Sequence, residues 1–360
     1  MLHTGFDAPL YSLEMRCIKE CQKSIFQLID KFSIPLRKCG TVLVAWTEQD
    51  KQKIPLIQQK SQQAELGEDI SEVTASSLYK LEPALASGAL GALHVPGECV
   101  VDSWLLGISY LHHAQMQGAK VLTNCRVISV TDGLLHTTRG VVQAKVTMNC
   151  AGLYGDLVDK LVDINTFRIL PRKGQYCVFD KSASPLFNSI IFPVPSEKSK
   201  GVAVFRSVYD NVIAGPTAEE VEGRSRPDFS PATHSMLSTH AKNVIPQLED
   251  LMPIGNFTGV RPATEYKDYQ IRSYPDKKWI SVSGIRSTGV SASLGIAQYL
   301  SEKLTDDMGV LPSTGDNVTL LDIDWKISEN GQSVIFDDKY IYQASHPLFV
   351  YGHQRMESKL

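Results

Sequence analysis

The chain has 360 residues, 43% of them hydrophobic and 21% charged, with a formal net charge of −3. This length suits one large or two coupled domains, and the charge provides no basic field for nucleic acid or an anionic membrane. No apolar run reaches the roughly 18–20 residues of a membrane-spanning helix, and residues 1–9 lack the features of a signal peptide. Seven cysteines are an odd number for a disulfide framework, and no spacing among them predicts a metal site.

The first part of the chain favours helices and one buried strand. Residues 12–32 place apolar side chains at helical spacing, which predicts an amphipathic helix that ends before Pro35. The apolar run at residues 41–46 predicts a short buried strand. Polar, mostly helix-forming sequence follows at residues 48–65, and a further helix is predicted over residues 71–81.

From about residue 92 the pattern changes to alternating helices and strands. Asp102 is the expected N-cap of a helix that ends near Gly118. Strand-like runs follow at residues 120–123, 126–130 and 140–149, and the middle of the chain has mixed strands with one helix near residues 232–244. A strand at residues 279–283 and a helix at residues 291–304 close the pattern. Such alternation indicates a doubly wound α/β sheet.

Three stretches resemble motifs of FAD enzymes in the D-amino-acid oxidase superfamily. Residues 146–156 (VTMNCAGLYGD) are similar to an internal strand–turn–helix of that family, and residues 259–262 (GVRP), followed by Asp268, are similar to its G-x-R-P…D segment. Residues 282–293 (VSGIRSTGVSAS) resemble the closing strand–turn–helix that holds the flavin. Residues 2–9, 39–45 and 171–176 resemble the branch that contains glycerol-3-phosphate and L-2-hydroxyglutarate dehydrogenases, and the likeness spans about residues 2–305.

The resemblance implies an α/β fold in which a Rossmann-like FAD/NAD(P)-binding domain is interleaved with an α+β substrate domain. We expect the FAD-binding domain to use residues 1–30, 92–165 and 277–306, the substrate domain residues 31–91 and 166–276, and residues 307–360 to form an irregular tail. Family members begin with a strand and a Gly-x-Gly-x-x-Gly turn that cradles the pyrophosphate. This chain begins almost at the later His-x-Gly turn and contains no such motif. We therefore expect an N-terminally truncated form that lacks the first βαβ unit, through an alternative start, an incomplete gene model or a loss of normal FAD binding. An exposed sheet edge or an apolar groove is expected where the first strand would pair.

The resemblance also implies which residues hold the flavin. A glycine at a strand-to-helix turn lets the backbone come close to a planar ring or a phosphate, although such glycines also serve simply as turn residues. A helix N-terminus stabilises the negative charge that collects on the flavin's pyrimidine edge on reduction. The expected cofactor-binding residues are Val127, which would suit a core strand equally well, Ala151, Gly152, Gly284, Ser287, Thr288, Gly289, Val290 and Ser291.

Substrate chemistry is expected from a few charged residues. Arg261 is the first candidate to hold an anionic substrate because its guanidinium group binds carboxylate or phosphate bidentately. Lys173 and Arg286 are secondary candidates, and each of the three would otherwise form an ordinary surface ion pair or a solvated charge. His3 is the candidate base that removes the hydroxyl proton as hydride leaves for the flavin. Its position also suits a frayed terminus.

These expectations favour an FAD-dependent dehydrogenase or oxidase that acts on a small anionic 2-hydroxy acid or polyol phosphate. The alternative is a catalytically silent truncated homologue that acts as a binding or regulatory partner, and an amino-acid oxidase is a weaker third reading. The sequence leaves the substrate, the electron acceptor and the oligomeric state open. The C-terminal Ser358-Lys359-Leu360 matches a peroxisomal address, and without it a cytoplasmic location is expected.

Overall fold

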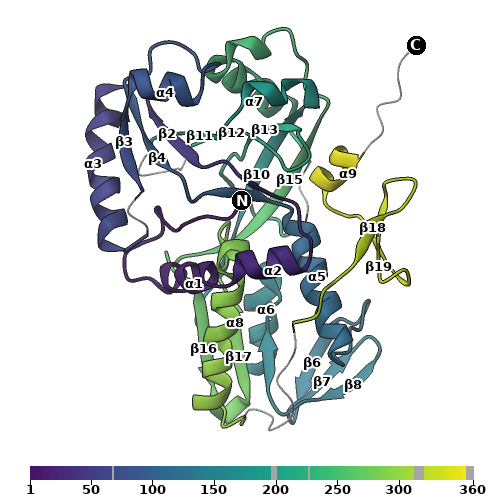
Figure 1. The fold of residues 1–360 in the computed structure, drawn as a ribbon. Coiled ribbons are helices and arrows are strands. Elements are labelled where there is room, and N and C mark those ends of the chain that lie inside the picture. The colour runs from purple at the N-terminus through teal and green to yellow at the C-terminus, as the bar shows by residue number, and fades with distance from the viewer. Residues whose placement is uncertain (67–68, 196–200, 226–227, 312–319, 354–360) are drawn as a thin grey trace.

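The computed structural model describes residues 1–66, 69–195, 201–225, 228–311 and 320–353. Figure 1 shows two halves between which the chain passes several times, with the N-terminus lying between them. The upper half is built on one large sheet, and the lower half on small sheets and long helices. The expected mixed α/β fold is confirmed. The C-terminal tripeptide lies outside the described residues.

The upper half contains a nine-stranded sheet in the order β14-β10-β13-β12-β11-β2-β4-β3, with β15 pairing β10. The β2–β11 pair is parallel and the other pairs are antiparallel. The strands are β2 (Thr41–Ala45), β3 (Ser71–Thr74), β4 (Gly91–Val95), β10 (Ile169–Phe179), β11 (Ile190–Pro193), β12 (Ala203–Arg206), β13 (Val212–Gly215), β14 (Glu219–Glu220) and β15 (Gly255–Thr264). The helices are α3 (Glu48–Gln63), α4 (Ala75–Leu81) and α7 (Pro231–Val244), with short 3-10 turns η3 (Lys181–Leu186) and η4 (Pro246–Leu248).

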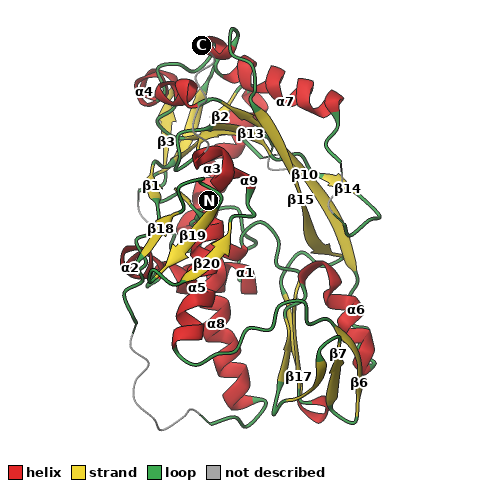
Figure 2. Ribbon diagram, turned by 90° about the vertical axis from the view of Figure 1, so that its right-hand side faces the viewer, coloured by secondary structure: helices red, strands yellow, loops and turns green. Residues whose placement is uncertain are grey.

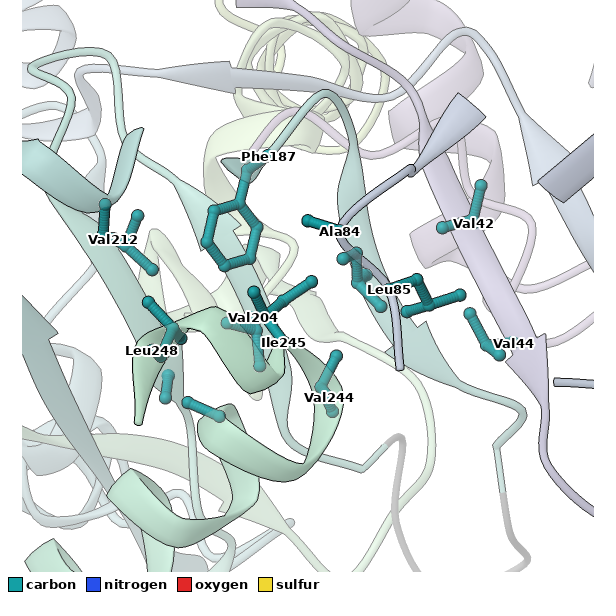
Figure 3. Close-up of a cluster of buried hydrophobic side chains, with 14 of the residues drawn as sticks. Val42, Val44, Ala84, Leu85, Phe187, Val204, Val212, Val244, Ile245 and Leu248 are labelled. Carbon is teal, nitrogen blue, oxygen red and sulfur yellow. The ribbon is translucent and has the colours of Figure 1, made fainter. Parts of the chain in front are cut away.

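Helices cover this sheet and bury its central strands. All five residues of β2 are buried, as expected for a central strand with both faces covered. One core cluster lies between the sheet and α7, and it includes Val42, Phe187, Val204 and Ile245 (Figure 3). Burying a large aliphatic or aromatic side chain contributes about 1.5–3 kcal/mol, so this cluster is a main source of stability for the half.

The lower half contains a three-stranded sheet in the order β16-β17-β9, in which β17 and β9 are parallel. A separate meander is formed by β6, β7 and β8. The strands are β6 (Val127–Thr131), β7 (Leu134–Thr137), β8 (Gly140–Gln143), β9 (Thr147–Asn149), β16 (Gln270–Tyr274) and β17 (Trp279–Ser283), and β1 (Leu36–Lys38) pairs with β5 (Cys99–Val101). The helices are α1 (Leu13–Gln22), α2 (Ile25–Lys31), α5 (Ser103–Met116), α6 (Gly155–Asp159) and α8 (Gly289–Asp306), with η1 (Gly152–Tyr154), η2 (Lys160–Val162) and η5 (Pro275–Lys277).

Helices α1 and α8 lie against each other in the lower half (Figure 1). A Cβ atom at Gly295 would lie 2.0 Å from the Cys17 carbonyl oxygen, so only glycine allows this approach. The outer edge of β9 has no strand partner among the described residues.

Several predicted elements differ from the structure. The helix expected over residues 12–32 is broken into α1 and α2 at Lys23 and Ser24, and residues 120–123 form no strand. Residues 71–74 are a strand because they pair with β4. The same pairing network places β4 in the large sheet, although the sequence assigned it to the FAD-binding domain. Strand β16, assigned to the substrate domain, pairs with β17 instead.

The segment expected to be an irregular tail is ordered over most of its described part. It forms β18 (Trp325–Ile327), β19 (Ser333–Phe336), β20 (Tyr340–Gln343) and α9 (Pro347–His353). Buried His112 of α5 holds this segment, with its Nε2 atom 2.9 Å from an Asp337 carboxylate oxygen and its ring packed between aromatic side chains of the segment.

Candidate functional site

His3 lies in a buried position beside the first turn of α8. Its ring Nδ1 is 2.8 Å from a Glu98 carboxylate oxygen, and its backbone N–H donates to the Ser291 hydroxyl oxygen at 2.8 Å. Glu98 is fully buried and also accepts hydrogen bonds from the backbone N–H and the hydroxyl of Thr4, at 2.6 and 2.9 Å. Because an ionised carboxylate only accepts hydrogen bonds, we assign the ring proton of His3 to Nδ1, which leaves Nε2 with a free lone pair. His3, the expected base, is therefore fixed by hydrogen bonds to Glu98 and Ser291 and does not lie in a frayed terminus.

The N-terminus of α8 provides the expected helix-terminal amides. The first intrahelical bond runs from the Ala292 N–H to the Thr288 carbonyl, so the N–H groups of residues 289–291 have no acceptor within the helix. The Thr288 side chain is buried, and its hydroxyl donates to Glu14 and contacts the Tyr269 hydroxyl. Any ligand contact at Thr288 would therefore come from backbone atoms.

A second turn lies at the same edge of the lower sheet. The carboxyl ends of the parallel strands β9 and β17 lie side by side, and ligands of open α/β sheets bind outside such ends. After β9, Gly152 has a φ of +55°, and no atom lies within 4 Å of the position a Cβ would take. After β17, Gly284 has a φ of +71°. Ala151 is exposed next to Gly152, so the backbone of this turn is open to a ligand.

Strands β10 and β15 form a long antiparallel pair (Figure 2), and three of its cross-strand residue pairs lie on one face. Tyr176 and Phe257 are partners whose rings stack 4.3 Å apart. Two residues along, Gly174 faces Gly259, and after another two, Arg172 faces Arg261. Because strand residues alternate between faces, these three pairs share one face of the two strands. The Arg261 guanidinium donates to the Thr217 carbonyl at 3.1 Å.

The secondary anion candidates are engaged elsewhere. Lys173 lies on the opposite face from Arg261 and forms an ion pair of 3.0 Å with Glu219. Arg286 donates to the Lys267 carbonyl at 2.5 Å and pairs with buried Glu14 at 3.3 Å. Val127 begins β6 in the separate meander and is not brought together with the β9 and β17 turns by strand pairing. Two further residues were not predicted from the sequence. Glu98 lies within hydrogen-bond distance of the His3 ring, and Arg172 is the cross-strand partner of Arg261.

A cavity of about 150 Å³ lies where the chain start, β10–β15 and the C-terminal segment meet. Its lining includes Met1, Tyr176, Phe257 and, from the C-terminal segment, His346 and Phe349. Burial lowers the pKa of the Met1 amino group below its usual range. Among the residues that the structure describes, no group of three His, Cys, Asp or Glu side chains is placed to hold a metal ion. None of the helices in the described ranges combines the length and apolar character needed to cross a membrane.

The fold is a mixed α/β architecture with ligand-accessible turns at the carboxyl ends of two parallel strands, where cofactors of open α/β sheets bind. Residues 1–303 match the family model described as FAD dependent oxidoreductase, so the chain belongs to this family. It is 25% identical over 309 residues to a glycerol 3-phosphate dehydrogenase of Caloramator mitchellensis, covering 84% of this chain and 64% of that protein. It is 29% identical to an L-2-hydroxyglutarate dehydrogenase of Indibacter alkaliphilus, over 61% of this chain and 56% of the relative. The chain thus spans less than two thirds of either relative.

A solved structure has the same fold. L-α-glycerophosphate oxidase from Mycoplasma pneumoniae, determined with FAD bound, superposes with a TM-score of 0.80 at 23% identity and covers 89% of this chain and 86% of its own. The residues of this chain fit the flavin end of such a cofactor, because the open amides of α8 and the open turn at Gly152 meet at one sheet edge. No Gly-x-Gly-x-x-Gly cradle for the pyrophosphate occurs in the sequence.

Proposed function

We propose that this protein catalyses the FAD-dependent oxidation of a small anionic 2-hydroxy acid or polyol phosphate, with hydride transfer from the carbon that carries the hydroxyl to the flavin. The observation that carries the proposal is the buried His3–Glu98 pair against the first turn of α8. A general base fixed in one tautomer next to a helix N-terminus is the arrangement that alcohol oxidation by a flavin needs.

The chain's own residues supply the proton acceptor and its orientation. FAD, when bound, accepts the hydride and carries the redox chemistry. His3 Nε2 takes the substrate hydroxyl proton, so that the C–O bond becomes a carbonyl as the C–H bond breaks. Glu98 keeps the proton of the neutral ring on Nδ1 and stabilises the imidazolium that forms, as the carboxylate of a catalytic triad does.

Arg261 supports an anionic substrate in this proposal. It lies on the face of β10–β15 that also presents Tyr176 and Phe257, both of which line the cavity that reaches Met1. The relatives point the same way, since their names specify glycerol 3-phosphate and L-2-hydroxyglutarate, which are anionic alcohols. An amino-acid oxidase has less support because residues 2–9 and 171–176 resemble the hydroxy-acid branch of the family.

The test is a flavin spectrum followed by anaerobic reduction. The chain is mixed with excess FAD, desalted and examined for bound yellow flavin. It is then mixed without oxygen with sn-glycerol 3-phosphate, L-2-hydroxyglutarate or glycine. Bleaching by either anionic alcohol supports the proposal, and bleaching by glycine alone supports the amine reading. Bound flavin that none of the three reduces would overturn the proposal and favour a silent binding partner.

A further inference from the structure

We propose that Arg172 and Arg261 form a two-arginine clamp, and that the clamp binds the phosphate group of a phosphate monoester in preference to a carboxylate. This inference rests on the proposed function and deepens it, because it selects polyol phosphates from the two substrate classes. The clamp is defined as the guanidinium groups of these two residues and the space above the Gly174–Gly259 pair.

The strand register places the two arginines together. Arg172 of β10 and Arg261 of β15 are direct antiparallel partners, so their side chains leave the same face. Directly opposed residues have Cβ atoms about 4.5–5.5 Å apart. Lys173, one residue along, points to the other face and is neutralised by Glu219 at 3.0 Å. The two guanidinium groups therefore leave the substrate face, with the Glu220 carboxylate next to Arg172 at the outer strand, and the paired Lys173 lies on the opposite face.

Neither arginine forms an ion pair within 4 Å among the residues that the structure describes, although exposed Glu220 of β14 is the cross-strand neighbour of Arg172 on the side away from Arg261. Other arginines do form ion pairs: Arg16 pairs with Glu302, Arg37 with Asp210 and Arg224 with Asp156. The Arg172 Nε atom is buried without a hydrogen-bond partner in the described part of the chain. Like charges directly opposed across strands destabilise a sheet. An unpaired buried donor adds to that cost, and a bound anion would relieve both.

The glycine pair next to the arginines provides the space. A Cβ atom at Gly174 would lie 2.3 Å from the Arg261 Nη2 atom, so any larger residue there would displace the guanidinium. A Cβ at Gly259 would have no atom within 4 Å, which shows open space above the strand at this point. The clamp therefore combines a fixed guanidinium with room for a tetrahedral group.

The number of donors, together with the charge of the ligand, favours phosphate. A phosphate monoester carries about −1.5 to −2 charges near pH 7, whereas a carboxylate carries −1. Two guanidinium forks present enough donors for three phosphate oxygens, but a carboxylate fills only one fork. Arg172 is therefore the residue that distinguishes the two substrate classes, and Arg261 serves both.

The test measures anion binding to the protein without flavin, so that it does not depend on turnover. Dissociation constants for sn-glycerol 3-phosphate and L-lactate are measured by calorimetry, with 31P NMR as a second readout. We expect Arg172→Gln to weaken phosphate-ester binding roughly ten- to a hundredfold and to leave L-lactate binding within about twofold. Arg261→Gln should weaken both ligands.

Two further variants make the result decisive. Lys173→Gln removes a cation from the same strand but the opposite face, and should leave both affinities within about twofold. Gly259→Val keeps every charge but fills the open space, and should weaken phosphate-ester binding at least tenfold. Absent phosphate-ester binding, or equal losses in the Arg172→Gln and Lys173→Gln variants, would overturn the clamp. Intact binding with a flavin that no substrate reduces would refute the proposed function and leave the clamp standing.

Discussion

Replacing Glu98 with glutamine changes one atom in the buried pair and tests whether His3 is a base. The Glu98 carboxylate accepts three hydrogen bonds, two from Thr4 and one from the His3 ring. In the Glu98→Gln variant the amide oxygen still accepts both bonds from Thr4. The amide NH2 then faces the ring, so the ring Nδ1 must become an acceptor and its proton must move to Nε2. The nitrogen that takes the substrate proton is thereby blocked.

The magnitude follows from the loss of one general base. Such a base contributes about 10²- to 10⁴-fold in rate, and the matching carboxylate-to-amide change in a catalytic triad costs about 10⁴-fold. We expect flavin reduction to slow by about 10²- to 10⁴-fold. The glutamine side chain can still form three hydrogen bonds, two with Thr4 and one with the His3 ring, so the free energy of unfolding should fall by less than about 2 kcal/mol.

Two measurements check this prediction. Rapid-mixing absorbance gives the rate of flavin reduction at saturating substrate, and 15N NMR of the imidazole gives the tautomer of His3 without any flavin. If the variant keeps its ring proton on Nδ1, Glu98 does not set the tautomer of His3. If the proton moves to Nε2 and the reduction rate stays within about threefold of the parent rate, His3 is not the base.

Four further predictions address other parts of the molecule. Arg261→Lys should raise KM at least tenfold with a smaller effect on kcat, because the bidentate fork is lost; steady-state kinetics with unchanged KM would exclude Arg261 as the anion ligand. Asp156 is desolvated, which raises its pKa, but its bonds to Arg224 and the Ile169 N–H outweigh this and hold the pKa below its usual range. Asp156→Asn should therefore cost about 2 kcal/mol of unfolding free energy at pH 7, and the difference should shrink as the pH falls below about 4, where the unfolded carboxylate takes up a proton that the native carboxylate, with its lowered pKa, still lacks; denaturant melts with a pH-independent difference would contradict this. The 360-residue chain should bind FAD more weakly than a version extended upstream by a Gly-x-Gly-x-x-Gly unit, because the phosphate cradle is added; equal affinities in a fluorescence titration would argue otherwise. A fluorescent protein fused to the N-terminus should reach peroxisomes only when Ser358-Lys359-Leu360 is present, and diffuse signal from both versions would reject the address.

Local sequence patterns predicted the parts of the site that lie on single turns. Gly152, with a φ of +55°, begins η1 after β9, and Gly284, with a φ of +71°, directly follows β17. Each turn lies within a few consecutive residues, which is why the family resemblance could mark it. The helix after Asp102 was predicted with its cap, because Asp102 accepts the Leu105 N–H as an N-cap does.

Long-range partners were not predictable in this way. Glu98 lies 95 positions from His3, and no periodicity connects a buried carboxylate with a ring that far away. The choice between Arg172 and Lys173 depends on which strand face meets the site. The register with β15 decides that choice, because a shift of one residue exchanges the two faces. The order of the C-terminal segment was not predicted for the same reason, since the His112–Asp337 contact joins residues 225 positions apart.

The proposed function requires that His3 removes the hydroxyl proton while the adjacent C–H bond breaks toward flavin. Single-turnover flavin reduction with sn-glycerol 3-phosphate, either unlabelled or deuterated at C2, tests it directly in the parent chain supplied with saturating FAD and in the His3→Asn variant. We predict slower reduction with the deuterated substrate, together with a loss of at least 10²-fold in the variant. Reduction that is equally fast with both substrates and in both proteins would contradict the claim.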